Sequence, residues 1–432
     1  MDKQTVKVGL MGLGTVGTGV VRLIEGHQED LRKQTGCNIA IEKILVQDKE
    51  KERNVSVPPE KLTDNPRDIL HHKDIDVVIE VIGGIEAART YVTEALINEK
   101  HVVTANKDLM ALHGVELLHV AEEQGCDLLY EASVAGGIPI IRTLVEGFAS
   151  DRITKVVGIV NGTTNYILSK MSQEGATFAA VLKEAQQLGY AEADPTADVA
   201  GLDAARKMAI LGTLAFRMNV SLEDVDVAGI SSVTPEDIEY AKQLGYEMKL
   251  VGIAEDDDGT IDISVQPTMI PQEHPLASVN GVFNAVYVYG EAVGETMFYG
   301  PGAGELPTAT AVVSDLVNVV KNMRLGVNGR GTVAPYREKR VKTAEQRYAK
   351  YFLRLHVADR AGVLAKITQL FAAHDISLEK VLQVPHNGGH EAEIVIVTHS
   401  ASKDGFERVV EQMQQLDVVH DVKSSYRVEG SD

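Results

Sequence analysis

The first 130 residues alternate short, apolar, β-branched runs with longer stretches in which apolar residues recur at helical spacing. The strand-like runs are VKVGLMG, IAIEKILV, DVVIEVIG, HVVTANK and CDLLYEAS. Runs of this kind, separated by helices, are typical of βαβ units, in which parallel strands form a sheet and helices cover its faces. We therefore predict an α/β fold whose first domain, residues 1–131, is built on a parallel sheet.

A second α/β pattern starts at about Ile153. The run ITKVVGIV predicts a strand, Asn161 and Gly162 predict a turn, and helices are expected from Asn165 and over residues 178–188. Later strand-like runs are IDISVQPTMI and VNGVFNAVYVYG, and a helix-like stretch follows with PGAGELPTATAVVSDLVNVV. We predict a second domain over residues 132–330, and leave open whether its last helix returns to the first domain.

The C-terminal part begins after a polar connection. Residues 331–350 carry many charges and one proline, which is typical of a linker. Residues 351–428 then predict the order strand, helix, strand, strand, helix, strand. This order makes a compact βαββαβ domain.

Charge and cysteine content limit the partners and the compartment. The chain has 62 acidic against 42 basic residues, a formal net charge of -20, which argues against binding to nucleic acid. Its two cysteines, Cys37 and Cys126, are too few for a disulfide framework and fit a reducing compartment. The N-terminus lacks a signal-peptide pattern, and apolar stretches end well before the roughly 20 residues of a membrane span. We expect a cytoplasmic protein without a membrane segment.

A glycine-rich turn follows the first strand. Gly12, Gly14 and Gly17 have G-x-G-x-x-G spacing at a strand-to-helix junction, the context that a dinucleotide-binding Rossmann domain requires. Gly12 can make the tight turn, Gly14 admits a pyrophosphate to the backbone, and Gly17 allows close helix packing. The remaining residues that we assign to cofactor contact in this turn are Leu13, Thr15 and Val16.

The residues after the second strand bear on cofactor choice. A carboxylate there usually binds the ribose hydroxyls of NAD, whereas basic groups suit the extra phosphate of NADP. The segment contains both kinds of side chain: Gln47, Asp48, Lys49, Lys51 and Arg53. We favour NADP and keep NAD as the alternative, and ordinary exposed charges would also explain the run.

Residues 185–210 concentrate ionisable groups. Asp203 and Lys207 are four residues apart and hence on one face of a helix, and Glu192, Asp194 and Asp198 precede them. A lysine there can donate a proton to a carbonyl oxygen as hydride arrives, while the carboxylates bind an ammonium group. A surface i,i+4 salt bridge explains the Asp203–Lys207 spacing equally well.

The same segment resembles the signature of homoserine dehydrogenases. The matching positions are Ala185, Gly189, Tyr190, Ala191, Asp194, Pro195, Asp198, Gly201, Asp203 and Lys207. Four other segments are similar to that family: GLGTVG, VVTANKDLM, YEASVAGGIPI and VNGTTNYIL. The resemblance therefore spans the first 330 residues, and it implies that the second domain, residues 132–330, also mediates dimerisation.

The resemblance implies an activity and its residues. The family reduces L-aspartate 4-semialdehyde to L-homoserine reversibly with NAD(P)H, in threonine, methionine and isoleucine biosynthesis. Its substrate-binding acids fall on Glu192 and Asp203, and its catalytic lysine candidates fall on Lys207 and Lys107. We favour Lys207 as the proton donor and keep Lys107 as a second candidate or a cofactor-orienting group.

Three further sites follow from the resemblance and the predicted sheet. Thr104 and Asn106 follow a strand at the carboxyl edge of the sheet, where ligands bind, and Thr104 is expected to contact the cofactor. Gly302 resembles a second cofactor contact, although helix capping would also explain its segment. The family's monovalent-cation site, expected to hold sodium, falls on the backbone carbonyls of Glu131, Val134, Gly136 and Ile138.

The C-terminal domain, with its VADRAGVLAKI segment, resembles an ACT domain, which commonly binds amino acids. The turn is formed by Asp359, Arg360, Ala361 and Gly362, and the helix start after it can receive an amino-acid carboxylate. Threonine is the effector that we expect, with oligomerisation alone as the alternative. The assembly is expected to be a homodimer or a homotetramer.

Two other functions compete with this one. The first is a different amino-acid or hydroxyacid dehydrogenase with the same tail, but such an enzyme needs an Arg and a His pairing that does not stand out here. The second is a non-catalytic sensor that binds nucleotide and an amino acid. The presence of Glu192, Asp203, Lys107 and Lys207 disfavours the sensor.

Overall fold

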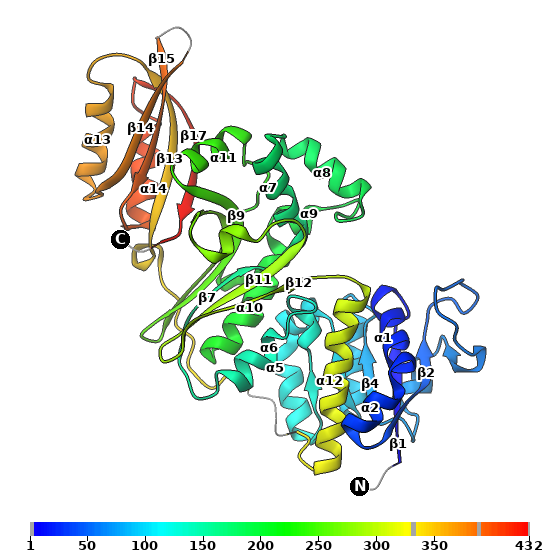
Figure 1. Ribbon diagram of the computed structural model, residues 1–432. Helices are drawn as coiled ribbons and strands as arrows, with labels where there is room; N and C mark the ends of the chain where they lie inside the picture. Colours follow the sequence, from blue (N-terminus) through cyan, green and yellow to red (C-terminus); the bar gives the residue numbers. More distant parts are fainter. Residues whose placement is uncertain (1–3, 330–333, 387–389, 431–432) are drawn as a thin grey trace. The chain divides into compact units, whose positions relative to one another are not determined.

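The computed structural model describes residues 4–329, 334–386 and 390–430 (Figure 1). The chain forms two compact units. The first comprises Met1–Val156, Arg206–Glu223 and Asn284–Glu338, and the second comprises Val157–Ala205, Asp224–Phe283 and Lys339–Asp432. Each is described by itself.

The first unit contains a six-stranded parallel sheet with strand order β3-β2-β1-β4-β5-β6. Its strands are β1 (Thr5–Met11), β2 (Asn38–Leu45), β3 (Leu62–Thr63), β4 (Val77–Glu80), β5 (His101–Thr104) and β6 (Leu128–Leu129). The five runs expected from the sequence correspond to all of these except β3. The first strand lies in the middle of the sheet, so the turn after it opens at the carboxyl edge where strand order reverses.

The first unit also contains helices, most of which contact this sheet. They are α1 (Thr15–Gly26), α2 (Gln28–Thr35), α3 (Arg67–Leu70), α4 (Glu86–Ile97), α5 (Lys107–Glu123), α6 (Ile140–Arg142) and α12 (Glu305–Leu325). The last of these, far away in sequence, packs along α1 (Figure 1). The two helices approach each other closely at Gly19, where a Cβ would lie only 2.7 Å from the Glu305 carbonyl oxygen. Apolar residues of β1, α1 and α12 form one buried cluster.

Four more elements contribute to the first unit in whole or in part: β7 (Ile153–Ile159), α10 (Leu202–Phe216), β11 (Phe283–Gly290) and β12 (Gly294–Pro301). Most of α10 belongs to this unit, and its first residues belong to the second.

The second unit contains a mixed sheet in which the strands β9-β10-β17-β13-β15-β14 are neighbours in this order. Before the C-terminal domain its elements are α7 (Gly162–Glu174), α8 (Phe178–Gln187), α9 (Thr196–Val199), β8 (Val225–Val227), α11 (Pro235–Gln243), β9 (Tyr246–Asp257) and β10 (Thr260–Pro271). The C-terminal domain joins this sheet through a short parallel pairing in which Thr268 and Met269 face Arg427 and Val428.

The C-terminal domain has the expected βαββαβ order. Its elements are β13 (Tyr348–Ala358), α13 (Val363–Ala373), β14 (Leu378–His386), β15 (Glu391–Thr398), β16 (Ala401–Ser402), α14 (Lys403–Met413) and β17 (Val419–Val428). The pairings of β13 with β15 and β17, and of β14 with β15, are antiparallel. Both helices pack on the sheet through buried apolar residues such as Phe371 and Phe406. The predicted α/β fold class is confirmed.

The short strands β3, β8 and β16, and strand β12, were not expected from the sequence, and two further features of the second unit differ from the expectation. Strand β9 was not predicted because charged residues interrupt its apolar run, yet it pairs with β10 along its whole length. Lys249 within it is only 1% exposed, and its ammonium donates to the Val279 carbonyl at 2.7 Å and to Asn280 Oδ1 at 2.8 Å. Helix α7 begins at Gly162, three residues earlier than expected, because Asn161 caps it. Among the described residues, no helix is both long and apolar enough to cross a membrane.

Candidate active site

The turn between β1 and α1 needs glycine for steric reasons. Gly12 has a φ of +104°, and a Cβ there would lie 2.7 Å from the Val81 carbonyl oxygen. A Cβ on Gly17 would lie 2.2 Å from the Gly12 carbonyl oxygen. Gly14 is the N-cap of α1, without a side-chain cap, and, its chain neighbours aside, no atom of the described residues lies within 4 Å of the position that its Cβ would take. The start of α1 is thus uncapped by a side chain, and the free amides of a helix start suit an anion.

A cavity of about 460 Å³ extends from this turn to the loop after β2. Leu13 lines it near the turn, and Lys51 and Arg53 line it in the loop. Arg53 is held by backbone carbonyls, since its guanidinium donates to the oxygens of Lys51, at 2.7 Å, and of Asp48. The Asp48 carboxylate accepts from the Glu50 amide at 2.9 Å. Both an acid and two cations thus border the cavity. Thr15 and Val16 form the first turn of α1, where Thr15 is exposed and Val16 packs on the core.

At the carboxyl edge of the sheet, Glu80 joins the ends of β4 and β5. Its carboxylate accepts from the Thr104 hydroxyl at 2.6 Å and from the Ile82 amide at 2.9 Å. The backbone N–H of Asn106 donates to the Thr104 hydroxyl, and the Asn106 side chain caps α5 by accepting from the Leu109 backbone N–H. Lys107 is the first residue of that helix, and its position is therefore fixed by this network.

Glu80 was not singled out in the sequence. It is fully buried, and burial raises the pKa of its carboxyl group against the effect of its hydrogen bonds. The available signal was an acid inside the apolar run VVIEVIG, because a charged residue in a buried strand needs partners or a purpose.

An ion pair connects the start of α5 with α10 in the first unit. Asp108 Oδ1 lies 3.0 Å from Arg206 Nε. Each of these residues is the sequence neighbour of a candidate catalytic lysine, Lys107 in one case and Lys207 in the other. The structure thus brings together the backbone segments of the two lysines, a link that the sequence pattern did not indicate.

One of the two acids predicted to bind substrate, Asp203, contacts Asn161 in the second unit, and Asp198 contacts the same side chain. The Asn161 amide nitrogen donates to Asp198 Oδ1 at 2.7 Å and to Asp203 Oδ2 at 2.8 Å. Asp203 is 4% exposed and lies one helical turn before Lys207 on α10. Glu192 is exposed, and its backbone carbonyl accepts from the Gln186 side chain at 3.2 Å.

Asp194, a member of the acidic segment, has a local structural role. Its carboxylate accepts from the Thr196 hydroxyl at 2.6 Å and the Thr196 amide at 3.1 Å, and these bonds lower its pKa. The carboxylate thus shapes the turn that leads into α9, which is a common use of aspartate at a helix start.

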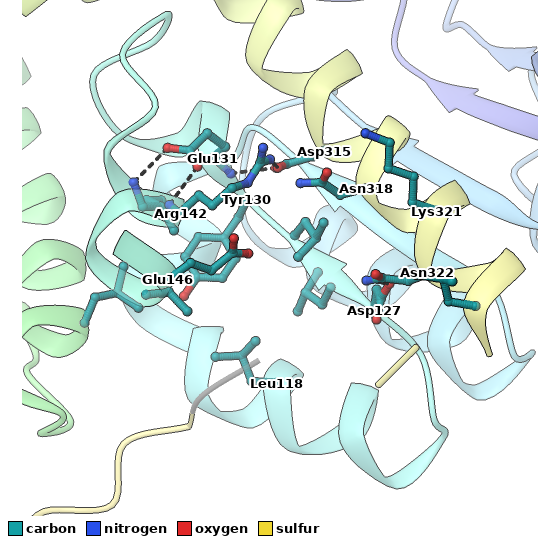
Figure 2. A pocket seen from close by; sticks show the side chains of 16 residues that line it. Leu118, Asp127, Tyr130, Glu131, Arg142, Glu146, Asp315, Asn318, Lys321 and Asn322 are labelled. Atoms are coloured by element: carbon teal, nitrogen blue, oxygen red, sulfur yellow. Dashed lines mark hydrogen bonds and ion pairs between the residues drawn. The ribbon is translucent and has the colours of Figure 1, made fainter. Parts of the chain in front are cut away.

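Glu131 lines a second cavity, of about 420 Å³, in the first unit (Figure 2). Its carboxylate accepts from the amides of Ile141 and Arg142 at 2.7 and 2.8 Å, and its own amide donates to Asp315 at 2.8 Å. Figure 2 shows Arg142 reaching Asp315, at 2.9 Å. Burial raises the Asp315 pKa to about 7, and the nearby Glu131 charge adds to the effect. Helix α12 thereby fastens the segment that begins at Glu131.

The predicted cation ligands follow in that segment. Val134, Gly136 and Ile138 are buried, and φ is positive at both Ala135 and Gly136. Among the described residues, no hydrogen-bond donor reaches the carbonyl oxygens of Val134 and Gly136, whereas the Ile138 carbonyl accepts from Ile140. Buried carbonyl oxygens without donors suit a hard cation.

Gly302 lies against the same segment. A Cβ on Gly136 would come within 2.4 Å of the Gly302 carbonyl oxygen, and a Cβ on Gly302 would collide with the Asn284 amide. Asn284 is 1% exposed, and its Oδ1 has no hydrogen-bond partner in the described part of the chain. Close packing alone therefore accounts for glycine at both positions.

The parallel sheet with its glycine turn, the segment of acids and lysines, and the βαββαβ domain together define a nicotinamide-dependent oxidoreductase with a C-terminal ACT domain. Family models match in the same order: "Homoserine dehydrogenase, NAD binding domain" over residues 12–131, "Homoserine dehydrogenase" over 139–317 and "ACT domain" over 351–418. The chain belongs to the homoserine dehydrogenase family, NAD(P)-dependent oxidoreductases that interconvert L-homoserine and L-aspartate 4-semialdehyde.

Relatives and solved structures agree along the whole chain. The homoserine dehydrogenase of Bacillus subtilis is 60% identical over 429 residues, with 99% of each chain covered. That of Mycobacterium tuberculosis (strain H37Rv) is 44% identical and covers 100% of this chain and 99% of its own. The crystal structure of a homoserine dehydrogenase from Thiobacillus denitrificans superposes with a TM-score of 0.93 at 41% identity, covering 98% of both chains. A hyperthermophilic archaeal homoserine dehydrogenase, solved in complex with NADPH, has a TM-score of 0.62 at 26% identity over 73% of this chain and 97% of its own.

Proposed function

We propose that Lys207 is the proton donor to the C4 oxygen of L-aspartate 4-semialdehyde, and that Glu192 and Asp203 bind the substrate's ammonium group. The bound nicotinamide supplies the hydride for C4. As the hydride arrives, negative charge develops on the oxygen, and a lysine ammonium there stabilises it and transfers its proton. The observation that carries the proposal is the buried carboxylate of Asp203, one helical turn from Lys207 on α10. An aspartate carboxylate binds an ammonium group through both charge and hydrogen bonds.

Lys107 is proposed as the second candidate, or as a group that orients the cofactor together with Thr104. In support, Lys107 starts α5 directly after the Glu80, Thr104 and Asn106 network, at the carboxyl edge of the sheet. Ligands of open parallel sheets bind at this edge. Gly302 completes the proposed cofactor contacts.

We propose NADP as the preferred cofactor. Lys51 and Arg53 line the same cavity as Gly12, Leu13 and Gly14, and two cations suit a 2′-phosphate. Asp48 in the same loop would serve NAD instead, so the Arg53→Ala variant decides between the two cofactors. If NADP is preferred, this variant raises KM for NADP and leaves KM for NAD unchanged.

We also propose a sodium site formed by the carbonyls of Glu131, Val134, Gly136 and Ile138. The support is the buried turn with positive φ at Ala135 and Gly136. Within the described part of the chain, the buried carbonyls of Val134 and Gly136 receive no hydrogen bond, so they are the ones best placed to accept a cation. Isothermal titration with sodium chloride against choline chloride measures its binding.

We also propose an effector for the ACT domain and an oligomeric state for the enzyme. Threonine is proposed to bind the ACT domain at the turn before α13, where Gly362 has a φ of +90° and a Cβ would meet open space. The enzyme is proposed to be a cytoplasmic homodimer or homotetramer, with domains over residues 1–131, 132–330 and 351–428. Light scattering after size-exclusion chromatography distinguishes the two assemblies.

The central experiment follows the absorbance of NADPH, and then of NADH, after L-aspartate 4-semialdehyde is added to the purified full-length protein. Faster oxidation of NADPH supports the cofactor preference, and slowing by threonine supports the effector. Equal rates with both cofactors contradict the preference. A rate that threonine leaves unchanged contradicts the effector.

A further inference from the structure

We propose that Asn161 is a positioning residue for substrate: its side-chain amide holds Asp198 and Asp203 together so that they receive the substrate's ammonium group. This rests on the proposed role of Asp203. The inference goes beyond helix capping, which is the role that the sequence segment VNGTTN suggests by itself.

The side-chain amide of Asn161 forms hydrogen bonds through both its oxygen and its nitrogen. Its oxygen accepts from the Thr164 backbone amide and from the Thr164 hydroxyl, each at 2.9 Å. Its nitrogen donates to Asp198 at 2.7 Å and to Asp203 at 2.8 Å. An amide nitrogen carries two hydrogens, so it serves one carboxylate with each. Because Thr164 fixes the oxygen end, the nitrogen end cannot turn away from the acids.

Asn161 and the two acids are largely shielded from water. Asn161 is 5% exposed and Asp203 is 4% exposed, while Asp198 is half-buried. Two carboxylates that share one nitrogen repel each other, and water has little access to screen them. The neutral amide holds both oxygens in place without cancelling their charge. On the proposed role of Asp203, the substrate's ammonium group binds to the two carboxylates that Asn161 holds together.

Helix capping does not require asparagine at this position. Serine, threonine and aspartate cap helices equally well through a side-chain oxygen. None of them in its usual charge state offers a pair of donors beyond that oxygen. The next residue, Gly162, packs closely on the neighbouring chain, since a Cβ there would lie 2.7 Å from the Val282 carbonyl oxygen. The choice of asparagine is thus explained by the two acids.

The test compares Asn161→Ser with Asn165→Ser. Serine keeps a capping oxygen at position 161 but cannot reach the two acids. Asn165 is a matched control, since it lies in the first turn of the same helix, is 1% exposed, and donates to the carbonyls of Val279 and Phe283 instead. Both variants lose buried hydrogen bonds, but only Asn161→Ser disturbs the acids.

The substrates are L-homoserine and 4-hydroxybutanoate, which lacks the ammonium group. We expect Asn161→Ser to raise KM for homoserine about tenfold or more, with a smaller change in kcat. The kcat/KM for 4-hydroxybutanoate and the KM for the nicotinamide cofactor stay as in the unaltered enzyme. Asn165→Ser leaves the preference for homoserine over 4-hydroxybutanoate unchanged. If Asn161→Ser folds poorly, Asn161→Thr has the same capping oxygen and replaces it.

Equal losses with both substrates, or the same pattern in both variants, would overturn the proposal. Asp203→Asn separates this failure from failure of the proposed site. If Asp203→Asn leaves the homoserine KM unchanged, the substrate role of Asp203 is wrong. If Asp203→Asn raises KM while Asn161→Ser does not, Asp203 binds substrate and the positioning role of Asn161 is wrong.

Discussion

Asp108 on α5 and Arg206 on α10 form an ion pair at 3.0 Å, and each is the neighbour of a candidate catalytic lysine. The pair fixes the start of α5 relative to α10 within the first unit. The distance between the backbone segments of Lys107 and Lys207 therefore depends on a contact made by neither lysine. Positional errors of an ångström at reacting groups are enough to lower turnover strongly.

We expect Arg206→Met to lower kcat about tenfold or more, because the pair orients both lysine segments. Steady-state kinetics with homoserine measures the effect. Arg89→Met is the matched control. Arg89, on α4, pairs with Glu116 of α5 at 2.8 Å, and both side chains are more exposed than those of Asp108 and Arg206. Unchanged kcat in Arg206→Met would show that the ion pair is only a surface contact.

The glycine turn allows a prediction that separates folding from binding. Gly14→Ala places its methyl group in open space, so we expect an unchanged melting temperature and weaker NADPH binding, because the methyl group occupies the anion's approach. Gly17→Ala would bring its methyl group to 2.2 Å from the Gly12 carbonyl oxygen, so we expect a lower melting temperature as well. Thermal unfolding and NADPH fluorescence titration measure the two effects. Full NADPH affinity in Gly14→Ala would contradict the assigned binding mode.

The sequence predicted those elements whose pattern follows from local burial. Five of the six strands of the parallel sheet were found because apolar, β-branched residues dominate them and most of these residues are buried. Strand β9 was missed because its buried lysine, Lys249, is satisfied by Val279 and Asn280, which are distant in sequence. The short parallel contact between β10 and β17 likewise joins residues about 160 positions apart, which no local pattern reveals.

In the candidate site, too, local patterns could be predicted and contacts between distant segments could not. The glycine turn and the acidic segment were visible because their spacing is local. Glu80, Asp108 and Arg206 were missed because their partners come from other elements: Thr104 for Glu80, and α10 for Asp108. Asn161 was visible as a helix cap, but its contact with Asp203 spans 42 residues.

Buried Lys249 predicts a pH dependence of stability. Burial lowers its pKa from 10.5 to about 8. Between these values the unfolded chain keeps the proton that the folded protein has lost, so stability rises with pH by about 3 kcal/mol from this group. In Lys249→Met this gain is absent. We therefore expect the stability difference between the unaltered protein and the variant to shift in favour of the unaltered protein as pH rises from 8 to 10.

Urea unfolding at pH 8, 9 and 10 measures this shift. The exposed Lys33, whose side chain is 65% accessible, provides the control variant Lys33→Met, for which the difference stays constant. A constant difference for Lys249→Met as well would mean that Lys249 keeps its proton through this range.

Substitution of the two lysines tests the proposed proton donor. We expect Lys207→Ala to lower kcat about 100-fold or more while the melting temperature and the NADPH affinity stay unchanged, because a general acid acts in the transition state. Lys107→Ala is expected to lower kcat less and to weaken NADPH binding, since Lys107 follows the Thr104 and Asn106 network. Added methylamine supplies a small proton donor and should restore part of the activity of Lys207→Ala only. If methylamine instead restores Lys107→Ala, and Lys207→Ala keeps near-normal turnover, the two lysines exchange roles.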